Sequence, residues 1–157
     1  MFVTTELRFF ALNGNWTPGE EQIEHYKGRM KTFLNDFMIR NKKVTNERIE
    51  KYKETFNETV DKVYSIIGTK AFRRINENGD YETSFNRSIM DILMTSFSRF
   101  DKATLENKKA EINSKLKDLI INDKEFSDSI TIGTSDVKVI NYRLNRWYNE
   151  LNHLLNA

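Results

Sequence analysis

The hydrophobic residues of this chain recur mostly at intervals of three and four, which is the period of an α-helix. The most apolar stretch with this period runs from Ser84 to Phe100. Its apolar arc covers about half of a helical wheel, wider than the ~100° stripe of a surface helix. We therefore expect a central helix that begins at Ser84 as N-cap and is surrounded by the other helices. Its inward residues are predicted to be Phe85, Ile89, Met90, Ile92, Leu93, Met94, Phe97 and Phe100.

The same period predicts five further helices, and the polar segments between them predict loops. The helices are expected at 5–12, 29–40, 46–67 after the N-cap Thr45, 104–121, and from the N-cap Ser135 to Leu155. Residues 70–83 form the one non-helical excursion, because they contain the tight-turn signal Asn78-Gly79 between runs too short and polar to predict a hairpin. The fold expected is all-α, a single domain over 1–157 with about six helices packed around residues 85–100.

Composition supports a helical domain and excludes several classes of protein. The 157 residues suffice to bury about two-thirds of the unfolded surface, and one Pro and six Gly disfavour a turn-rich β architecture. Without cysteine there is no disulfide, cysteine nucleophile or thiolate metal site. A net charge of +2 does not indicate a nucleic-acid-binding protein. Neither a membrane-spanning run nor a secretory signal is apparent, so we expect a cytoplasmic protein with no membrane partner.

No motif in the sequence predicts a catalytic, cofactor or metal site. His25 and His153 lack the spacing of metal ligands and are expected to be solvated. The glycines form neither a phosphate-binding loop nor a dinucleotide fingerprint. Asp91 interrupts the apolar central helix. The favoured interpretation places it on the solvent side or in a pair with a nearby arginine, and the alternative is a buried acid that faces a partner.

Two groups of basic residues are candidates for contact with nucleic acid or a partner. Arg73 and Arg74 follow an aromatic residue and either contact phosphate or form an exposed pair at a helix end. In the last helix, Tyr142, Arg143 and Arg146 are expected on one flank of the apolar seam, together with His153. Such a flank is typical of a protein interface, and binding of nucleic acid is the alternative.

Several segments, taken in order, resemble the helical region of the GmrSD-type family. The residues that carry the resemblance are Glu6–Leu12, Tyr26–Gly28, Phe33–Met38, Ala71–Arg73, Phe85–Asp91, Ser129–Thr131, Thr134–Ser135 and Tyr142–Leu144. Members of this family are bacterial proteins linked to restriction of modified foreign DNA and to phage defence. Full-length members are credited with nucleotide hydrolysis and DNA cleavage, and carry an N-terminal ParB/sulfiredoxin-like domain with an Asp-Gly-Gln-Gln-Arg motif.

That motif does not occur in this chain, and no His-Asn-His nuclease motif follows the last predicted helix. The resemblance therefore implies no catalytic residue here. It implies the helical, non-catalytic part of a defence protein, which supports an upstream nuclease/NTPase domain and contacts DNA weakly or a partner. The apolar start at Phe2 predicts a fragment of a longer protein. The alternative is a stand-alone interaction module that dimerises through the flank Tyr142–Arg146 or through its N-terminal helix.

Overall fold

The structure is a computed structural model that describes the backbone of residues 2–157 and the side chains from Thr4 onward. Within this range the chain forms eight α-helices and one two-stranded antiparallel sheet. The elements in order are α1 (Phe2–Asn15), α2 (Met30–Arg40), α3 (Asn46–Ile67), β1 (Arg73–Ile75), β2 (Tyr81–Phe85), α4 (Arg87–Phe97), α5 (Lys102–Asn107), α6 (Lys109–Asn122), α7 (Lys124–Ser129) and α8 (Val137–Asn156).

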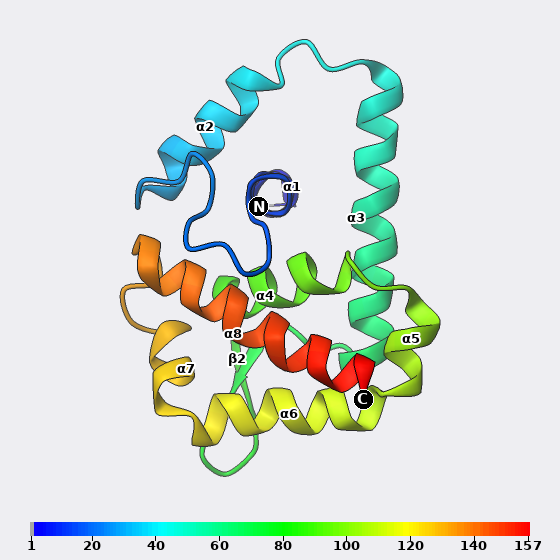
Figure 1. Ribbon diagram of the computed structural model, residues 1–157, viewed down its shortest axis with the longest axis vertical. Coiled ribbons are helices and arrows are strands. Elements are labelled where there is room, and N and C mark those ends of the chain that lie inside the picture. The colour runs from blue at the N-terminus through cyan, green and yellow to red at the C-terminus, as the bar shows by residue number, and fades with distance from the viewer. Residues whose placement is uncertain (1) are drawn as a thin grey trace.

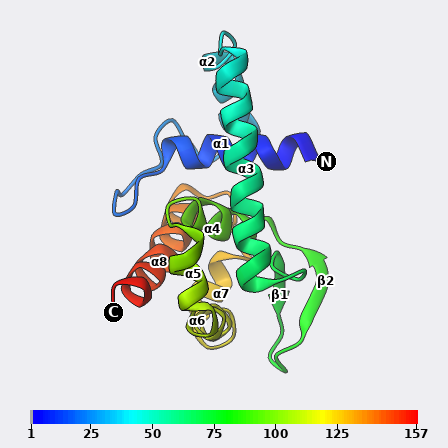
Figure 2. The same ribbon diagram turned by 90° about the vertical axis from the view of Figure 1, so that its right-hand side faces the viewer.

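Helix α4 lies at the centre of the molecule, and the other helices are arranged around it (Figure 1). Helix α1 packs on one side of α4 and α8 on the other, while the long helix α3 runs past one end of α4 along the longest axis. Figure 2 shows α1 crossing α3 about halfway along its length, with α5–α8 gathered below. Ten consecutive residues of α4, from Ser88 to Phe97, are buried. The predicted all-α fold around a central helix is therefore confirmed.

The start of the central helix differs from the prediction, because the residues before it form a strand. Asn86 is the N-cap: its side-chain oxygen accepts a hydrogen bond from the Ile89 N–H at 2.9 Å. Its own backbone N–H donates to the Phe72 carbonyl at 2.7 Å, which keeps the preceding residues extended. Ser84 consequently lies in β2, and Phe85 is 53% exposed instead of filling the core. Both of those assignments were wrong.

The non-helical excursion contains a hairpin that the sequence pattern did not predict. Strand β1 pairs with β2, with an irregularity in register between Arg73 and Ile75. The turn closes through the Asn76 side chain, which accepts hydrogen bonds from the backbone N–H groups of Asn78 and Asp80. Gly79 has a φ of 84°, a left-handed conformation that glycine adopts without steric cost.

Four other elements differ from the expected ones. Helix α1 spans Phe2–Asn15 instead of 5–12. The predicted helix 104–121 is divided into α5 and α6 at Lys108, whose ψ of 21° interrupts the helix. The predicted loop 123–134 contains α7, which begins with Asp123 accepting a hydrogen bond from the Phe126 N–H. Helix α8 is capped by Asp136 instead of Ser135. Helix α3 agrees with its prediction at both ends.

In the described part of the chain, no helix combines the length and the apolar character that a transmembrane span needs.

Replacing Ile92 by alanine tests the central position of α4. Ile92 is fully buried, so Ile92→Ala should lower the free energy of unfolding by about 2–5 kcal/mol through lost burial and a residual cavity. Ile39, in α2, is 70% exposed and provides the same substitution at a surface site. Urea denaturation followed by circular dichroism measures both variants. Equal effects of Ile92→Ala and Ile39→Ala would contradict the assignment of α4 to the core.

Candidate functional site

The central helix carries a carboxylate in the middle of the hydrophobic core. Asp91 is 1% exposed, although the residues on both sides of it in α4 are apolar and equally buried. An isolated charge in such a place would cost several kcal/mol. Asp91 must therefore be neutralised by partners from the elements packed against α4.

Two arginines from opposite ends of the sequence provide this neutralisation. Arg8 of α1 donates from Nε to Asp91 Oδ1 at 2.7 Å and from Nη2 to Oδ2 at 2.6 Å, a two-point contact between planar groups. Arg143 of α8 donates from Nη2 to Asp91 Oδ2 at 3.2 Å. We call Arg8, Asp91 and Arg143 the ion cluster. It joins α1, α4 and α8 through a single carboxylate.

Arg143 also fixes the segment that connects α7 to α8. Its Nη1 donates to the carbonyls of Ser129 at 3.1 Å and Thr134 at 3.0 Å. The side chain is wholly inaccessible to solvent. Burial lowers the pKa of Arg143, and the attraction of Asp91 opposes that effect only in part. The cluster thus holds two cations for one anion, and Arg143 Nε has no hydrogen-bond partner.

The pKa of Arg8 shifts in the opposite direction. Burial tends to lower it, but the charge of Asp91 and the two hydrogen bonds to its carboxylate outweigh burial and raise the pKa. Beside the cluster, the Tyr26 hydroxyl donates to the Ser135 carbonyl at 2.5 Å, and burial raises the pKa of this phenol. Tyr26 therefore ties the loop after α1 to the start of α8, next to the two arginines.

The structure separates the three residues of the predicted flank on α8. Arg143 is buried in the ion cluster, so the prediction that it forms part of a contact surface was wrong. Its position follows from the helical period, because it lies three residues after Ile140 and four before Trp147, both in the buried seam. That spacing was visible in the sequence. Because arginine is rarely buried without a partner, the residue type favours an exposed position over the buried one that the spacing indicates.

Tyr142 and Arg146 lie partly exposed on α8. Arg146 forms ion pairs with Glu150 and, at 3.2 Å, with Asp123, so acidic neighbours offset its charge. Arg146 also donates a hydrogen bond to the Glu150 carboxylate, and this bond lowers the pKa of Glu150. Burial raises the pKa of Tyr142. These contacts leave less free positive charge on this surface than the sequence suggests.

Arg73 and Arg74 lie on β1, where both side chains are partly buried. Arg74 lies 3.6 Å from Glu82 of β2, an ion pair that spans the hairpin. Among the described residues, no hydrogen bond or ion pair joins Arg73 or Arg74 to Tyr142 or Arg146. The basic residues singled out in the sequence therefore do not form one continuous cluster through direct contacts.

A second polar junction connects the end of α4 to the end of α1. Arg99 donates to the carbonyls of Asn13 and Trp16 and to the Asn13 side chain, and its guanidinium lies 4.8 Å from the centre of the Trp16 ring. A cation at this place complements the negative end of the α1 dipole. No acid pairs with Arg99 among the described contacts, and burial lowers its pKa.

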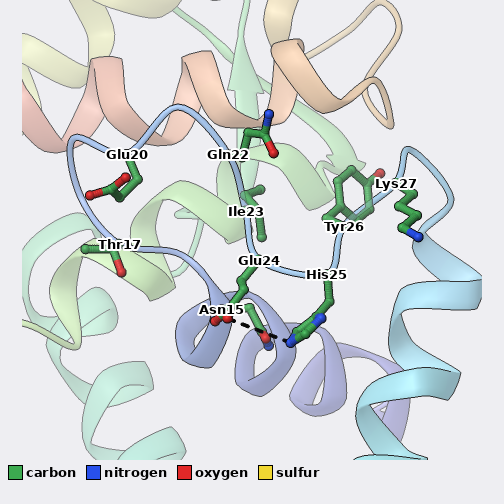
Figure 3. Close-up of a pocket in the computed structure, with 9 residues that line it drawn as sticks. All are labelled: Asn15, Thr17, Glu20, Gln22, Ile23, Glu24, His25, Tyr26 and Lys27. Atoms are coloured by element: carbon green, nitrogen blue, oxygen red, sulfur yellow. Dashed lines mark ion pairs between the residues drawn. The ribbon is translucent and has the colours of Figure 1, made fainter.

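The loop after α1 borders a surface cavity of about 450 Å³ (Figure 3). Glu24 and His25 lie 3.9 Å apart, and Figure 3 shows both of them beside Asn15. His25 has a φ of 63°, in the left-handed region that non-glycine residues seldom adopt. His25 and His153 are exposed, as predicted. Within the described residues, no three histidine or acidic side chains are grouped in a way that could hold a metal ion.

Comparisons with known proteins give little information about this chain. No protein-family model matches it, and no solved structure matches it. Reticulocyte-binding protein homolog 1 from Plasmodium falciparum (isolate 3D7) is 25% identical over 126 residues, which cover 80% of this chain. The matched region is 4% of that protein's length. A similarity of this extent does not show membership of a family.

Replacing Asp91 by asparagine tests whether the ion cluster holds the core together. Asp91→Asn retains the shape of the side chain but leaves two buried guanidinium groups without a counter-charge, so the free energy of unfolding should fall by about 3–5 kcal/mol. Asp118→Asn, at an exposed position of α6, is the matched control and should change it by less than about 0.5 kcal/mol. Chemical denaturation measures both. An Asp91→Asn variant as stable as Asp118→Asn would show that the cluster is not required.

Proposed function

We propose that this chain is the helical, non-catalytic part of a GmrSD-like bacterial restriction and phage-defence protein. In this proposal it acts in the bacterial cytoplasm and supports a ParB-like nuclease/NTPase domain encoded upstream. The catalytic residues belong to that upstream domain, and this chain supplies none. The proposal depends on the resemblance of several segments to that family, and on where the fold places them.

The ion cluster is the observation that supports this proposal. Arg8 lies in the segment Glu6–Leu12, Asp91 in Phe85–Asp91 and Arg143 in Tyr142–Leu144, three of the segments that carry the resemblance. These residues are distant in sequence and converge on one buried carboxylate. A chance similarity of surface residues would not be expected to involve segments that meet in the core. The convergence of these segments on Asp91 therefore favours a packing arrangement shared with the family.

The chemistry of the cluster favours a supporting role over a catalytic one. Asp91 accepts hydrogen bonds from both arginines and is closed to solvent, so its carboxylate is engaged within the fold. Arg143 donates from Nη1 to the backbone carbonyls of Ser129 and Thr134. Groups engaged in this way position helices and are not accessible to a substrate. We infer that the helical domain offers a rigid platform to the upstream domain.

The DNA that encodes this chain provides the first test. The proposal expects that the reading frame continues upstream of the Met1 codon and encodes Asp-Gly-Gln-Gln-Arg. Expressed in a bacterial host, the complete reading frame should lower the plating efficiency of phages with modified DNA bases and leave phages with unmodified DNA unaffected. Asp91→Asn should weaken this protection, because it destabilises the helical part, whereas Asp118→Asn should preserve it.

Two results would contradict the proposal. One is an in-frame stop codon upstream of Met1 with no Asp-Gly-Gln-Gln-Arg in the gene. The other is protection by the chain expressed alone, which would place the activity in this chain itself. The first result would favour the alternative of a stand-alone interaction module.

A further inference from the structure

The connection between α2 and α3 forms one end of the molecule along its longest axis (Figure 1), and Figure 2 shows it at the same end, beyond α1. We call residues 38–49 the tip. The backbone of the tip has a defined shape, because Lys42 N–H donates to the Ile39 carbonyl at 3.3 Å. The Thr45 hydroxyl accepts a hydrogen bond from Arg48 N–H at 3.3 Å and so caps the start of α3. The side chains of the tip are therefore presented from a structured turn.

The tip concentrates positive charge. It contains four basic residues and one acidic residue, Glu47, a net charge of +3, whereas the whole chain has +2, so the rest of the chain carries −1. Arg74 and Arg146 have acidic partners. The basic residues of the tip are all exposed and form no ion pair among the described contacts; they are Arg40, Lys42, Lys43 and Arg48. A surface of this kind attracts an anionic partner.

Exposed apolar side chains lie among these cations. Met38 is 48% exposed, Ile39 70% and Ile49 38%. Ile39 follows the buried residues Phe33 and Leu34 by six and five positions, a spacing that places it on the opposite face of α2. Ile39 therefore adds nothing to the core and remains in contact with water unless a partner covers it.

This combination fits a lipid surface better than it fits nucleic acid. Anionic headgroups attract lysine and arginine, and the boundary between headgroups and acyl chains accepts apolar side chains. The phosphates of nucleic acid would attract the cations but leave Ile39 in water, and single strands bind through aromatic side chains that stack on bases. The aromatic residues that flank the tip are engaged within the fold. Phe37 packs against the core, and the Tyr52 ring lies 4.8 Å from that of Phe10.

We propose that the tip binds a surface of anionic lipid. Met38 and Ile39 enter the boundary between headgroups and acyl chains, while Lys42 and Lys43 lie against the phosphate groups. The expectation of no membrane partner rested on the absence of a membrane-spanning run, and a surface contact needs no such run. The cytoplasmic leaflet of a membrane has a negative surface potential, so this contact is open to a cytoplasmic protein. The inference does not depend on the function proposed above.

Co-sedimentation of the full chain with lipid vesicles tests the proposal. The chain should pellet with vesicles that contain both phosphatidylcholine and phosphatidylglycerol. It should remain in solution with vesicles of phosphatidylcholine alone, because the cations of the tip require an anionic surface. Added salt should weaken the binding, because it screens the attraction between exposed charges.

The double variant Lys42→Gln/Lys43→Gln tests the cations of the tip. A lysine near an anionic surface raises the affinity about fivefold, so the double variant should bind mixed vesicles about 25-fold more weakly. The matched control is Lys109→Gln/Lys117→Gln, which removes the same charge from exposed residues of α6, toward the opposite end of the molecule (Figure 1). Its affinity should stay close to that of the wild-type chain, because distant exposed charges are screened.

Ile39→Ser tests the apolar part of the contact. It should lower the affinity for mixed vesicles about tenfold, because an apolar side chain no longer leaves water on binding. Ile132→Ser is the matched control, since Ile132 is 67% exposed and lies between α7 and α8, away from the tip. It should bind like the wild-type chain. Circular dichroism establishes that each variant is folded.

Three results would overturn the proposal. Binding to duplex DNA without binding to mixed vesicles would assign the tip to nucleic acid. A loss of vesicle binding in Lys42→Gln/Lys43→Gln with none in Ile39→Ser would show a purely ionic contact without insertion. An equal loss in Lys109→Gln/Lys117→Gln would show that net charge, and not the tip, decides the binding.

Discussion

The buried carboxylate of Asp91 is the constraint on which the rest of the structure depends. Helix α4 is buried from Ser88 to Phe97, so a charge near its middle must find partners in the helices that enclose it. Arg8 and Arg143 approach it from α1 and α8, which pack on different sides of α4. One carboxylate thereby fixes the relative positions of three helices. The Arg143 side chain extends this order to the segment before α8.

Other polar contacts of α4 follow the same arrangement. Ser96 accepts a hydrogen bond from the Trp147 indole at 2.9 Å, a second polar contact between α4 and α8. At the end of α4, Arg99 joins the carbonyls at the C-terminal end of α1. The polar contacts of the core therefore tie α4 to the same two helices. Directional contacts of this kind select one packing among several that apolar side chains alone would permit.

Much of the helical architecture could be predicted from the sequence, and the reasons for the failures are physical. The three- and four-residue period located α4, α3 and α8, because burial of an apolar stripe dominates local structure. The start of α4 was misplaced, because Ser84 is a good cap in isolation. Tertiary pairing of β2 with β1 decides its actual conformation. The division at Lys108 left no signal in the period of the surrounding apolar residues.

The candidate site was only partly predictable, because its residues come from distant parts of the sequence. A pairing of Asp91 with an arginine was one of the favoured interpretations, and the structure confirms the pairing. The partners lie 83 and 52 residues away, and nothing in a single sequence identifies them. The position of Arg143 in the seam of α8 could have been recognised from its spacing. The burial of Arg143 depends on the residue that faces it from α4, and that residue is Asp91.

NMR of the arginine side chains measures the ion cluster most directly. The Nε–H group of Arg143 is closed to solvent in this structure, and that of Arg8, whose side chain is 11% exposed, donates to Asp91. Their hydrogen exchange should be slow in the wild-type chain and should accelerate together in Asp91→Asn, while that of exposed Arg29 stays fast in both. Exchange of Arg8 and Arg143 as fast as that of Arg29 in the folded wild-type chain would contradict the account.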